Sequence, residues 1–390
     1  MASSPAQIAN AEGVAALRSG DAAAAVAAFR RATAADPGAG PLWRNLAHGY
    51  RLAGDAEGER AALNQALAID QRDFPARLRL AQLQERLGEE AMALVSWSAV
   101  QQLAAGLPGI SPELAVELEA GERYCEGLRG RLASAADAAI AGDAARNETE
   151  DRRVRAFVDH ALGRRRVYHN QCAGVFYPFL PEDEYFDRCH FPWFDQLEAA
   201  TSEIQAELRA LLDAPGDLIR PYVRFEEGTP DNEWSPLDGS LDWSACFLWE
   251  YGQPHQAVLD RCPKTAAVLA ALPLARIPGR APNAFFSVLR PQSKIPPHTG
   301  VTNTRAIIHL ALEVPPGCGF RVGNETREWV EGKAFAFDDS IEHEAWNDSD
   351  QRRAVLIIDA WNPHLSAREQ QAILHYFEAA DGALAGGGPR

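Results

Sequence analysis

A repeat of 34 residues occupies the first hundred residues of the chain and strongly limits what they can fold into. Gly20, Gly54 and Gly88 stand at equivalent positions, and each is followed by an acidic residue. Small and apolar residues recur around them, at Gly13, Ala47 and Ala81 upstream and at Phe29, Leu63 and Trp97 downstream. A period of this length predicts one helix pair per repeat, because a single pair cannot bury its apolar face and must stack on the next.

This pattern resembles the tetratricopeptide repeat, which has the same period and places small residues where its two helices touch. Trp43, Leu46 and Tyr50 of the second repeat stand where that family carries such residues. The resemblance implies a helical solenoid of three repeats over residues 1–106. Two roles remain open for it: a concave groove for a peptide or protein partner, or a structural or dimerisation element.

Residues 107–169 are rich in alanine, glutamate and arginine, which predicts a helical linker. The linker ends in two basic clusters, at residues 152–155 and 164–166. Such clusters are most often solvated helix faces, and that interpretation is favoured here.

The composition changes after Gln171, where short β-rich runs begin to alternate with turn residues. Two helical stretches, Phe194–Leu212 and Gln256–Leu272, come first. Strands are then expected at Ala284–Arg290, Arg305–Glu313, Gly319–Val322, Arg327–Val330, Ala334–Phe337, His343–Trp346 and Ala354–Asp359. This series predicts a β-sandwich or jelly-roll barrel over residues 170–370. Residues 371–390 are expected to hold a helix end and a disordered Gly-rich tail from Asp381 onward.

Charge and composition exclude several classes of partner. The net charge of −16 argues against nucleic acid and anionic membranes, since both require a basic surface. The sequence lacks a signal-peptide pattern and any apolar stretch of the roughly 18 residues that span a bilayer. Its six cysteines are scattered without CxxC spacing, which argues against a zinc knuckle or disulfide framework. We therefore expect a cytoplasmic protein with reduced thiols and no membrane or nucleic-acid partner.

Three residues in the C-terminal half stand in an order that suggests chemistry. His298 precedes His343 by 45 residues, and Arg353 follows ten residues later. Imidazole suits Fe(II) and leaves coordination positions open, and a guanidinium can clamp a carboxylate through two hydrogen bonds. Spacing alone is weak support, because a single histidine on a strand is more often a core residue than a ligand.

The text around these residues resembles the aspartyl/asparaginyl β-hydroxylase family. The runs that carry the resemblance are HTGVTNTRAIIHLAL, FRVGNETREWVEGKAFAFDDSIEHEAWNDSD and RRAVLIIDAWNP, and FYPFLPEDEYFDRCHFPWFDQLEAATSEIQAEL is similar to the start of that family's domain. The similarity extends from Phe176 to His364, and some family members also carry tetratricopeptide-like repeats. It implies an α+β multidomain protein whose C-terminal domain is a double-stranded β-helix (jelly roll). It also implies a 2-oxoglutarate-dependent dioxygenase that uses Fe(II) and O₂.

Carried over residue by residue, the resemblance assigns roles within the domain. His298 and His343 become the iron ligands. Arg353, helped by Ser287, would hold the distal carboxylate of 2-oxoglutarate, and His309 would contact it near the 1-carboxylate. The alternatives are a locally bonded strand hydroxyl for Ser287 and a buried core imidazole for His309.

Gly300 departs from the usual iron site. Most non-haem iron oxygenases carry a carboxylate two residues after the first histidine. Taken from the residues alone, glycine there allows a dead site or a carboxylate supplied by Asp338 or Asp339. The resemblance implies instead that glycine is normal in this family and that water completes the iron shell. A turn or supporting role is therefore favoured for the two aspartates over direct ligation.

Arg305 follows a Thr302-Asn303 turn and is expected to point into the substrate pocket, with a structural salt bridge as the alternative. Family members that act on aspartyl side chains carry a second arginine two residues later, where this chain has Ile307. An unpaired anion would be costly beside Ile307. An amide, hydroxyl or apolar substrate is therefore easier to accept than aspartate.

Three functions compete on this basis. The first is hydroxylation of an amino-acid side chain in a peptide or protein. The second is hydroxylation of a free amino acid, acyl chain or other small molecule. The third, from a different class, is a non-catalytic adaptor that joins the repeats to a retired barrel. The intact set of His298, His343 and Arg353 argues against the adaptor, because drift would be expected to spoil at least one of them.

Overall fold

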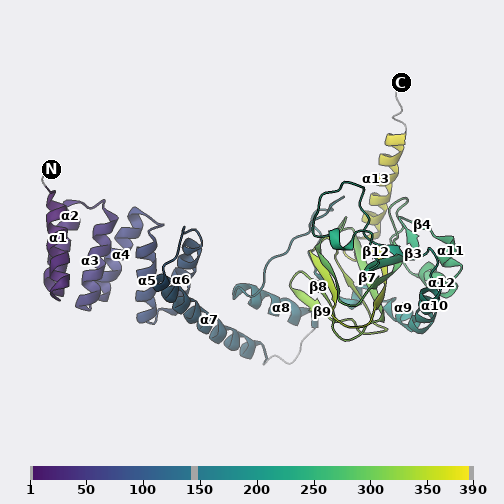
Figure 1. Ribbon diagram of the computed structural model, residues 1–390, viewed down its shortest axis with the longest axis horizontal. Helices are drawn as coiled ribbons and strands as arrows, with labels where there is room; N and C mark the ends of the chain where they lie inside the picture. The colour runs from purple at the N-terminus through teal and green to yellow at the C-terminus, as the bar shows by residue number, and fades with distance from the viewer. Residues whose placement is uncertain (1–2, 142–147, 386–390) are drawn as a thin grey trace, which may run out of the picture. The chain divides into compact units, whose positions relative to one another are not determined.

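The computed structural model describes residues 3–141 and 148–385, which form two compact units, Met1–Arg146 and Asn147–Arg390. The first unit begins with three pairs of helices that follow one another along the chain (Figure 1). The pairs are α1 (Pro5–Arg18) with α2 (Ala22–Ala35), α3 (Gly40–Ala53) with α4 (Ala56–Ile69), and α5 (Phe74–Arg86) with α6 (Glu90–Ala104). The expected helical repeat solenoid is confirmed.

The repeated glycine–acid pairs make the turn between the helices of each pair. Gly54 has a left-handed φ of 76°, which favours glycine, and Asp55 caps α4 by accepting a hydrogen bond from Gly58 N. The small residue upstream permits close packing, because a Cβ on Gly13 would lie 2.5 Å from the ring of Phe29. The third repeat differs, since Glu89 makes no cap and pairs with Arg60 at 2.6 Å.

Helix α7 (Pro112–Ala141) continues the first unit and packs on α6. A Cβ on Gly121 would lie 2.3 Å from the indole of Trp97, and Cys125 is fully buried in the same contact. This part of the expected linker is therefore helical and belongs to the core of the repeat unit.

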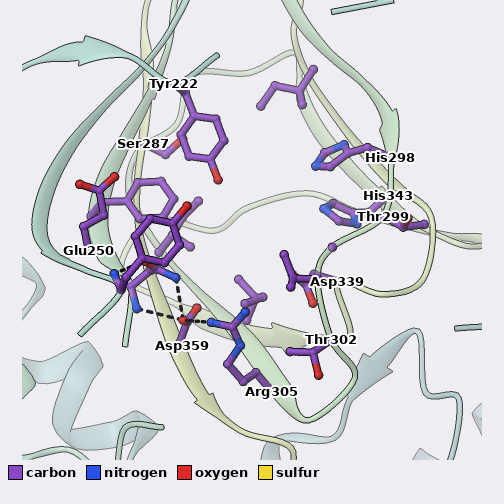
Figure 2. Close-up of a pocket in the computed structure, with 18 of the residues that line it drawn as sticks. Tyr222, Glu250, Ser287, His298, Thr299, Thr302, Arg305, Asp339, His343 and Asp359 are labelled. Atoms are coloured by element: carbon purple, nitrogen blue, oxygen red, sulfur yellow. Dashed lines mark hydrogen bonds and ion pairs between the residues drawn. The ribbon is translucent and has the colours of Figure 1, made fainter. Parts of the chain in front are cut away.

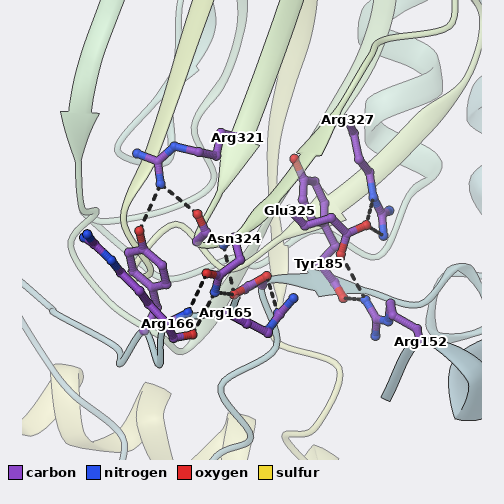
Figure 3. Close-up of polar contacts among 11 residues, drawn as sticks. Arg152, Arg165, Arg166, Tyr185, Arg321, Asn324, Glu325 and Arg327 are labelled. Atoms are coloured by element: carbon purple, nitrogen blue, oxygen red, sulfur yellow. Dashed lines mark hydrogen bonds and ion pairs between the residues drawn. The ribbon is translucent and has the colours of Figure 1, made fainter. Parts of the chain in front are cut away.

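Helix α8 (Glu148–Ala161) and the residues after it are attached to the β domain by arginines (Figure 3). Arg152 donates to the Tyr185 carbonyl at 2.8 Å and lies 3.1 Å from the Asp187 carboxylate. Arg165 pairs with Glu184 at 2.6 Å. The interpretation of both basic clusters as solvated helix faces is therefore wrong for these two arginines, whose carboxylate partners come from a later part of the chain.

Two antiparallel sheets form the body of the second unit. The larger has the strand order β1-β10-β7-β12-β5-β3-β2, with β4 paired to β3, and the smaller has the order β6-β11-β8-β9. The strands of the larger sheet are β1 (Tyr185–Phe186), β2 (Arg220–Pro221), β3 (Trp243–Glu250), β4 (Gln253–Pro254), β5 (Ala284–Leu289), β7 (Arg305–Glu313), β10 (Ala334–Phe337) and β12 (Arg353–Trp361). Those of the smaller are β6 (Ser293–His298), β8 (Cys318–Val322), β9 (Glu325–Arg327) and β11 (His343–Asn347). From β5 onward the chain repeatedly crosses between the sheets.

Helices cover one face of the larger sheet, and the smaller sheet covers the other. The helices are α9 (Phe194–Ala199), α10 (Thr201–Asp213), α11 (Gln256–Leu259) and α12 (Pro263–Ala271). After the last strand, α13 (Ala367–Ala385) packs on a separate buried cluster formed by Ala275, Ile277 and Ala281. Ile204 and Leu208 of α10 share a buried cluster with Ile308 and Leu310 of β7. Because strand side chains alternate between faces, Arg305, Ile307 and His309 point to the side of the smaller sheet.

The fold class is confirmed as helical repeats followed by an antiparallel β domain, and several local predictions need correction. The strand expected at Arg327–Val330 lies earlier, at Glu325–Arg327. Each expected long helix is two helices, broken at Ala200 and before Pro263. Strands β3 and β6 were not foreseen. In β6 the reason is Pro296 and Pro297, because proline cannot donate a hydrogen bond to a neighbouring strand and therefore argues against a strand in the sequence.

The C-terminal helix also runs further than expected. Helix α13 passes Asp381 and ends at Ala385, so a tail beginning at Asp381 is wrong, and residues 386–390 of that expected tail lie outside the described part of the chain. Among the described residues, no helix combines the length and apolar character needed to cross a membrane.

Candidate active site

One cavity of about 1010 Å³ lies between the two sheets. It is lined by all six residues that the sequence suggested as ligand-binding or catalytic: Ser287, His298, Arg305, His309, His343 and Arg353. Strand alternation accounts for four of them: Ser287 on β5, Arg305 and His309 on β7, and Arg353 on β12 all face away from the helices. His298 and His343 come from the smaller sheet. The structure therefore brings the set together, while the role of each residue stays a prediction.

His298 and His343 lie side by side because β6 and β11 pair with these two residues in register. Their ring centroids are 4.0 Å apart, and Figure 2 shows both imidazoles facing the cavity. His298 Nδ1 lies 2.8 Å from the Pro296 carbonyl, and His343 Nδ1 lies 3.0 Å from the Ile341 carbonyl. Each Nδ1 therefore donates to the backbone, which leaves the Nε2 lone pair of each ring free to bind a metal ion.

The protonation state of the two rings suits metal binding. Burial lowers the pKa of His298, and burial together with the neighbouring His298 lowers the pKa of His343 well below its usual range. Both imidazoles are therefore neutral at pH 7. Within the described part of the chain, no cluster of three or more His, Cys, Asp or Glu residues has metal-binding geometry. His298 and His343 are therefore a pair of candidate ligands rather than part of a larger cluster.

Asp339 fills the space that a side chain at position 300 would need. A Cβ built on Gly300 would lie 2.0 Å from Asp339 Oδ2, and Gly300 N donates to the Asp339 carbonyl at 2.6 Å. Asp339 Oδ1 is buried without a hydrogen-bond partner, and Figure 2 shows the side chain next to His343. Burial raises the pKa of Asp339 to about 8, opposed by the nearby Arg305.

Asp338 has a different environment from its neighbour. Its Oδ1 accepts hydrogen bonds from Ser340 N at 3.0 Å and from Ser340 Oγ at 2.6 Å, which is a turn stabilised by its own side chain. Its Oδ2 accepts from Asn170 Nδ2 at 2.9 Å. These bonds agree with the turn role favoured for Asp338.

Arg353 is a cation almost completely removed from water, with only 1% of its surface exposed. Its Nη1 lies 3.4 Å from Ser287 Oγ, which also accepts from Trp243 Nε1 at 3.1 Å. No carboxylate of the described residues forms a salt bridge with it, and its Nε has no partner. Burial accordingly lowers the pKa of Arg353 to about 10. A buried cation without a counter-charge is costly, so the position suits an anionic ligand.

His309 of β7 lies near Arg353 of the neighbouring strand β12, on the same face of the larger sheet. Its ring is nearly parallel to that of Trp329, with centroids 6.0 Å apart, and its Nδ1 has no hydrogen-bond partner. Burial, followed by the charge of Arg353, lowers the pKa of His309 well below its usual range. The ring is therefore neutral and can offer a ligand one donor and one acceptor.

Arg305 faces the cavity with its charge already compensated. It pairs with Asp359 of β12 at 2.5 Å, and Asp359 Oδ2 also accepts from Asn283 N at 2.9 Å (Figure 2). Ile307 follows Arg305 by two residues on β7 and faces the same side. It lines the cavity with an apolar side chain and packs with Phe320 and Phe337. The cavity wall beside Arg305 is therefore close to electrically neutral.

Sequence reasoning missed the residues on the far side of the cavity. Arg220 of β2 forms an ion pair with Glu250 of β3 and lies over the ring of Phe247, 4.7 Å from its centroid. Tyr222 stacks on Trp243 at 3.9 Å. No motif marked these positions, because β2 is only two residues long and β3 was not foreseen.

Comparison with known proteins gives different results for the two units. A solved complex of the yeast Sti1 TPR2B domain covers 30% of this chain and 97% of its own, with 22% identity and a TM-score of 0.29. The *Arabidopsis* OM64 TPR domain covers 33% of this chain and 96% of its own, with 16% identity and a TM-score of 0.28.

The β domain matches at the level of sequence. The aspartyl/asparaginyl beta-hydroxylase of *Mus musculus* is 39% identical over 188 residues, which are 47% of this chain and 25% of that protein. The ornithine lipid ester-linked acyl 2-hydroxylase of *Rhizobium tropici* is 33% identical over 190 residues, or 48% of this chain and 63% of that protein. This chain thus spans less than two thirds of either relative. The family model for aspartyl/asparaginyl beta-hydroxylase matches residues 198–363. The resemblance is confirmed: residues 198–363 match the aspartyl/asparaginyl beta-hydroxylase family in sequence.

Proposed function

We propose that the β domain, taken as residues 170–370, is an iron(II)- and 2-oxoglutarate-dependent dioxygenase that hydroxylates an amino-acid side chain in a peptide or protein. The observation that carries the proposal is Arg353, a buried cation without a carboxylate partner among the described residues, in the same cavity as two neutral histidines. The crossing of the chain between the two sheets from β5 to β12 supports the jelly-roll class.

His298 and His343 would hold the iron through their Nε2 atoms. Their Nδ1 hydrogen bonds to the Pro296 and Ile341 carbonyls fix the tautomer and the ring orientation, which strengthens an imidazole as a ligand. Two protein ligands leave more coordination positions open than the usual three. Asp339, whose buried Oδ1 lacks a partner, would accept a hydrogen bond from a water molecule in that shell.

Arg353 and its neighbours would hold the co-substrate. The guanidinium can donate two hydrogen bonds to the distal carboxylate of 2-oxoglutarate, with Ser287 beside it. His309 would donate or accept near the 1-carboxylate. When bound, iron(II), 2-oxoglutarate and O₂ supply the oxidising power, so that the oxo acid leaves as succinate and CO₂ and one oxygen atom enters a C–H bond as hydroxyl.

The substrate end of the cavity favours an uncharged group. Arg305 is neutralised by Asp359, Arg220 by Glu250, and Ile307 is apolar. An amide or apolar side chain can enter without leaving a buried charge unpaired. The same wall suits an acyl chain, and the similarity to the rhizobial acyl hydroxylase supports that second candidate.

Succinate release tests the function directly. The full chain should convert 2-oxoglutarate to succinate with Fe(II) and O₂, and mass spectrometry should detect one added oxygen in peptide substrates but not in acyl amino acids. His343→Ala should abolish iron-dependent turnover because one of two ligands is lost. His375→Ala, on the exposed side of α13, should leave it unchanged. Equal turnover in both variants would overturn the metal assignment, and no consumption of 2-oxoglutarate under any condition would support the retired adaptor.

Removal of residues 1–146 separates the substrate classes. This cut follows the boundary between the two compact units, so the β domain keeps its own contacts. A peptide hydroxylase whose repeats bind the substrate should lose affinity for peptide, whereas a small-molecule enzyme should keep its KM. If the KM is unchanged, the repeats would serve to bind a protein partner or to assemble the protein.

A further inference from the structure

Trp329 lies behind the part of the cavity where Arg353 and His309 meet. It belongs to the loop between β9 and β10 and is only 6% exposed. The guanidinium carbon of Arg353 lies 4.9 Å from the centroid of its ring, and the ring of His309 is tilted by only 15° from it. The indole thus touches both residues proposed to bind the oxo acid.

Few other contacts hold the Arg353 guanidinium in place. Within the described part of the chain its one hydrogen bond, to Ser287, is long at 3.4 Å, and its Nε has no partner. Among the described residues it forms no salt bridge. A cation over an aromatic face is attracted to it, most strongly where water is excluded. The face of Trp329 is therefore the main support against which the guanidinium can rest.

Trp329 packs against other aromatic rings, although its buried Nε1 has no hydrogen-bond partner within residues 3–141 and 148–385. Its ring centroid lies 5.4 Å from that of Phe320 on β8. The neighbouring strand β9 is tied down at both ends, since Glu325 lies 3.9 Å from Arg152 of α8 and the Arg327 guanidinium lies 4.0 Å from the ring of Tyr185 (Figure 3). The support behind Arg353 is thus a rigid part of the domain.

We propose that Trp329 is a positioning residue that fixes how deep in the cavity Arg353 meets the distal carboxylate of the oxo acid. This inference rests on the proposed function. His298 and His343 fix one end of the ligand and Arg353 fixes the other, so the depth of the guanidinium sets the length of the acid that fits. With Trp329 in place the site selects a five-carbon dicarboxylic oxo acid over the six-carbon homologue. Without the indole, the guanidinium can retreat and the longer acid gains.

The test measures binding by calorimetry, using the full chain loaded with nickel(II) and the two ligands 2-oxoglutarate and 2-oxoadipate. Trp329→Leu removes the ring, and Trp329→Phe keeps an aromatic face but replaces the indole by a smaller ring. Trp249→Leu is the matched control, because Trp249 is a partly buried indole of the same domain that packs on the helical side of the larger sheet. Circular dichroism and melting curves establish that each variant is folded.

Trp329→Leu should weaken 2-oxoglutarate binding about tenfold, as expected for the loss of a buried cation–π contact. In both Trp329 variants the preference for 2-oxoglutarate over 2-oxoadipate should fall, whereas Trp249→Leu should keep it. If the leucine variant does not fold, the preference of the phenylalanine variant decides. A folded Trp329 variant with unchanged preference overturns the inference and leaves the proposed function intact. A wild-type protein that binds neither acid overturns both.

Discussion

Replacing Gly300 by alanine should destabilise the β domain because the new side chain would collide with Asp339. The new Cβ would lie 2.0 Å from Asp339 Oδ2 and 2.3 Å from its Cγ, whereas ordinary contacts are 3.4–4 Å, so the carboxylate would have to move by more than an ångström. Gly300 has no left-handed φ, so its backbone accepts alanine without strain. Overpacking of this kind costs about 1–3 kcal/mol.

Asp339→Ala removes the three atoms nearest to the new Cβ. In that background Gly300→Ala should become neutral or stabilising by about 0.4–1 kcal/mol, because alanine restricts the unfolded chain. The coupling between the two changes should therefore be about 1–4 kcal/mol. Gly382→Ala, on helix α13 with nothing within 4 Å, is the matched control and should stabilise both backgrounds equally.

Urea unfolding followed by tryptophan fluorescence provides the assay, since seven of the nine tryptophans lie after residue 147. Equal effects of Gly300→Ala in the two backgrounds would refute the reasoning that Asp339 occupies this space.

The same geometry leads to an engineered site: Gly300→Asp combined with Asp339→Ala would place a carboxylate two residues after His298. That double variant should retain metal more tightly than wild type in competition with a chelator.

The other expectations concern buried charge. Arg353→Met should abolish 2-oxoglutarate binding in calorimetry. It should also raise the free energy of unfolding of the ligand-free protein by about 1–4 kcal/mol, because it removes a buried cation that has no carboxylate partner among the described residues. A less stable variant would mean that the contacts of Arg353 with Ser287 and Trp329 outweigh the cost of burying its charge. Because burial raises the pKa of Asp339 to about 8, wild-type stability should fall as the pH rises from about 4, where the unfolded carboxylate ionises, to about 8. Asp339→Asn should remove that loss, so urea unfolding at about pH 5, 7 and 9 should show a stability difference that grows with pH and then levels off; a constant difference would contradict the shift.

Residues on long, regular strands were the easiest part of the site to foresee. The run Arg305–Glu313 has the bounds of β7 in the structure, and its alternation places Arg305, Ile307 and His309 on one face. The pairing of His298 with His343 depends on the register of β6 with β11, which no local pattern encodes. Only the family resemblance predicted that His298 and His343 lie together.

The contact partners of Arg305 and Asp339 could not be foreseen from local signals. The pairing of Arg305 with Asp359 spans 54 residues and joins the start of β7 to the end of β12. The way Asp339 fills the space at Gly300 depends on a backbone contact between two loops. Such contacts arise only once the sheets are packed, so sequence spacing carries no trace of them.

The arginine ties at the two edges of the β domain determine how much chain a stable fragment needs. At one edge α8 and the residues after it are fastened by Arg152 and Arg165. At the other, Arg280 pairs with Asp381 of α13 at 2.7 Å and lies 4.2 Å from the ring of Phe377. A fragment cut at residues 170 and 370 would keep both sheets but leave Glu184 and Arg280 without these ion-pair partners. Residues 148–385 are therefore the natural unit for expression, and a protease should trim the shorter fragment faster.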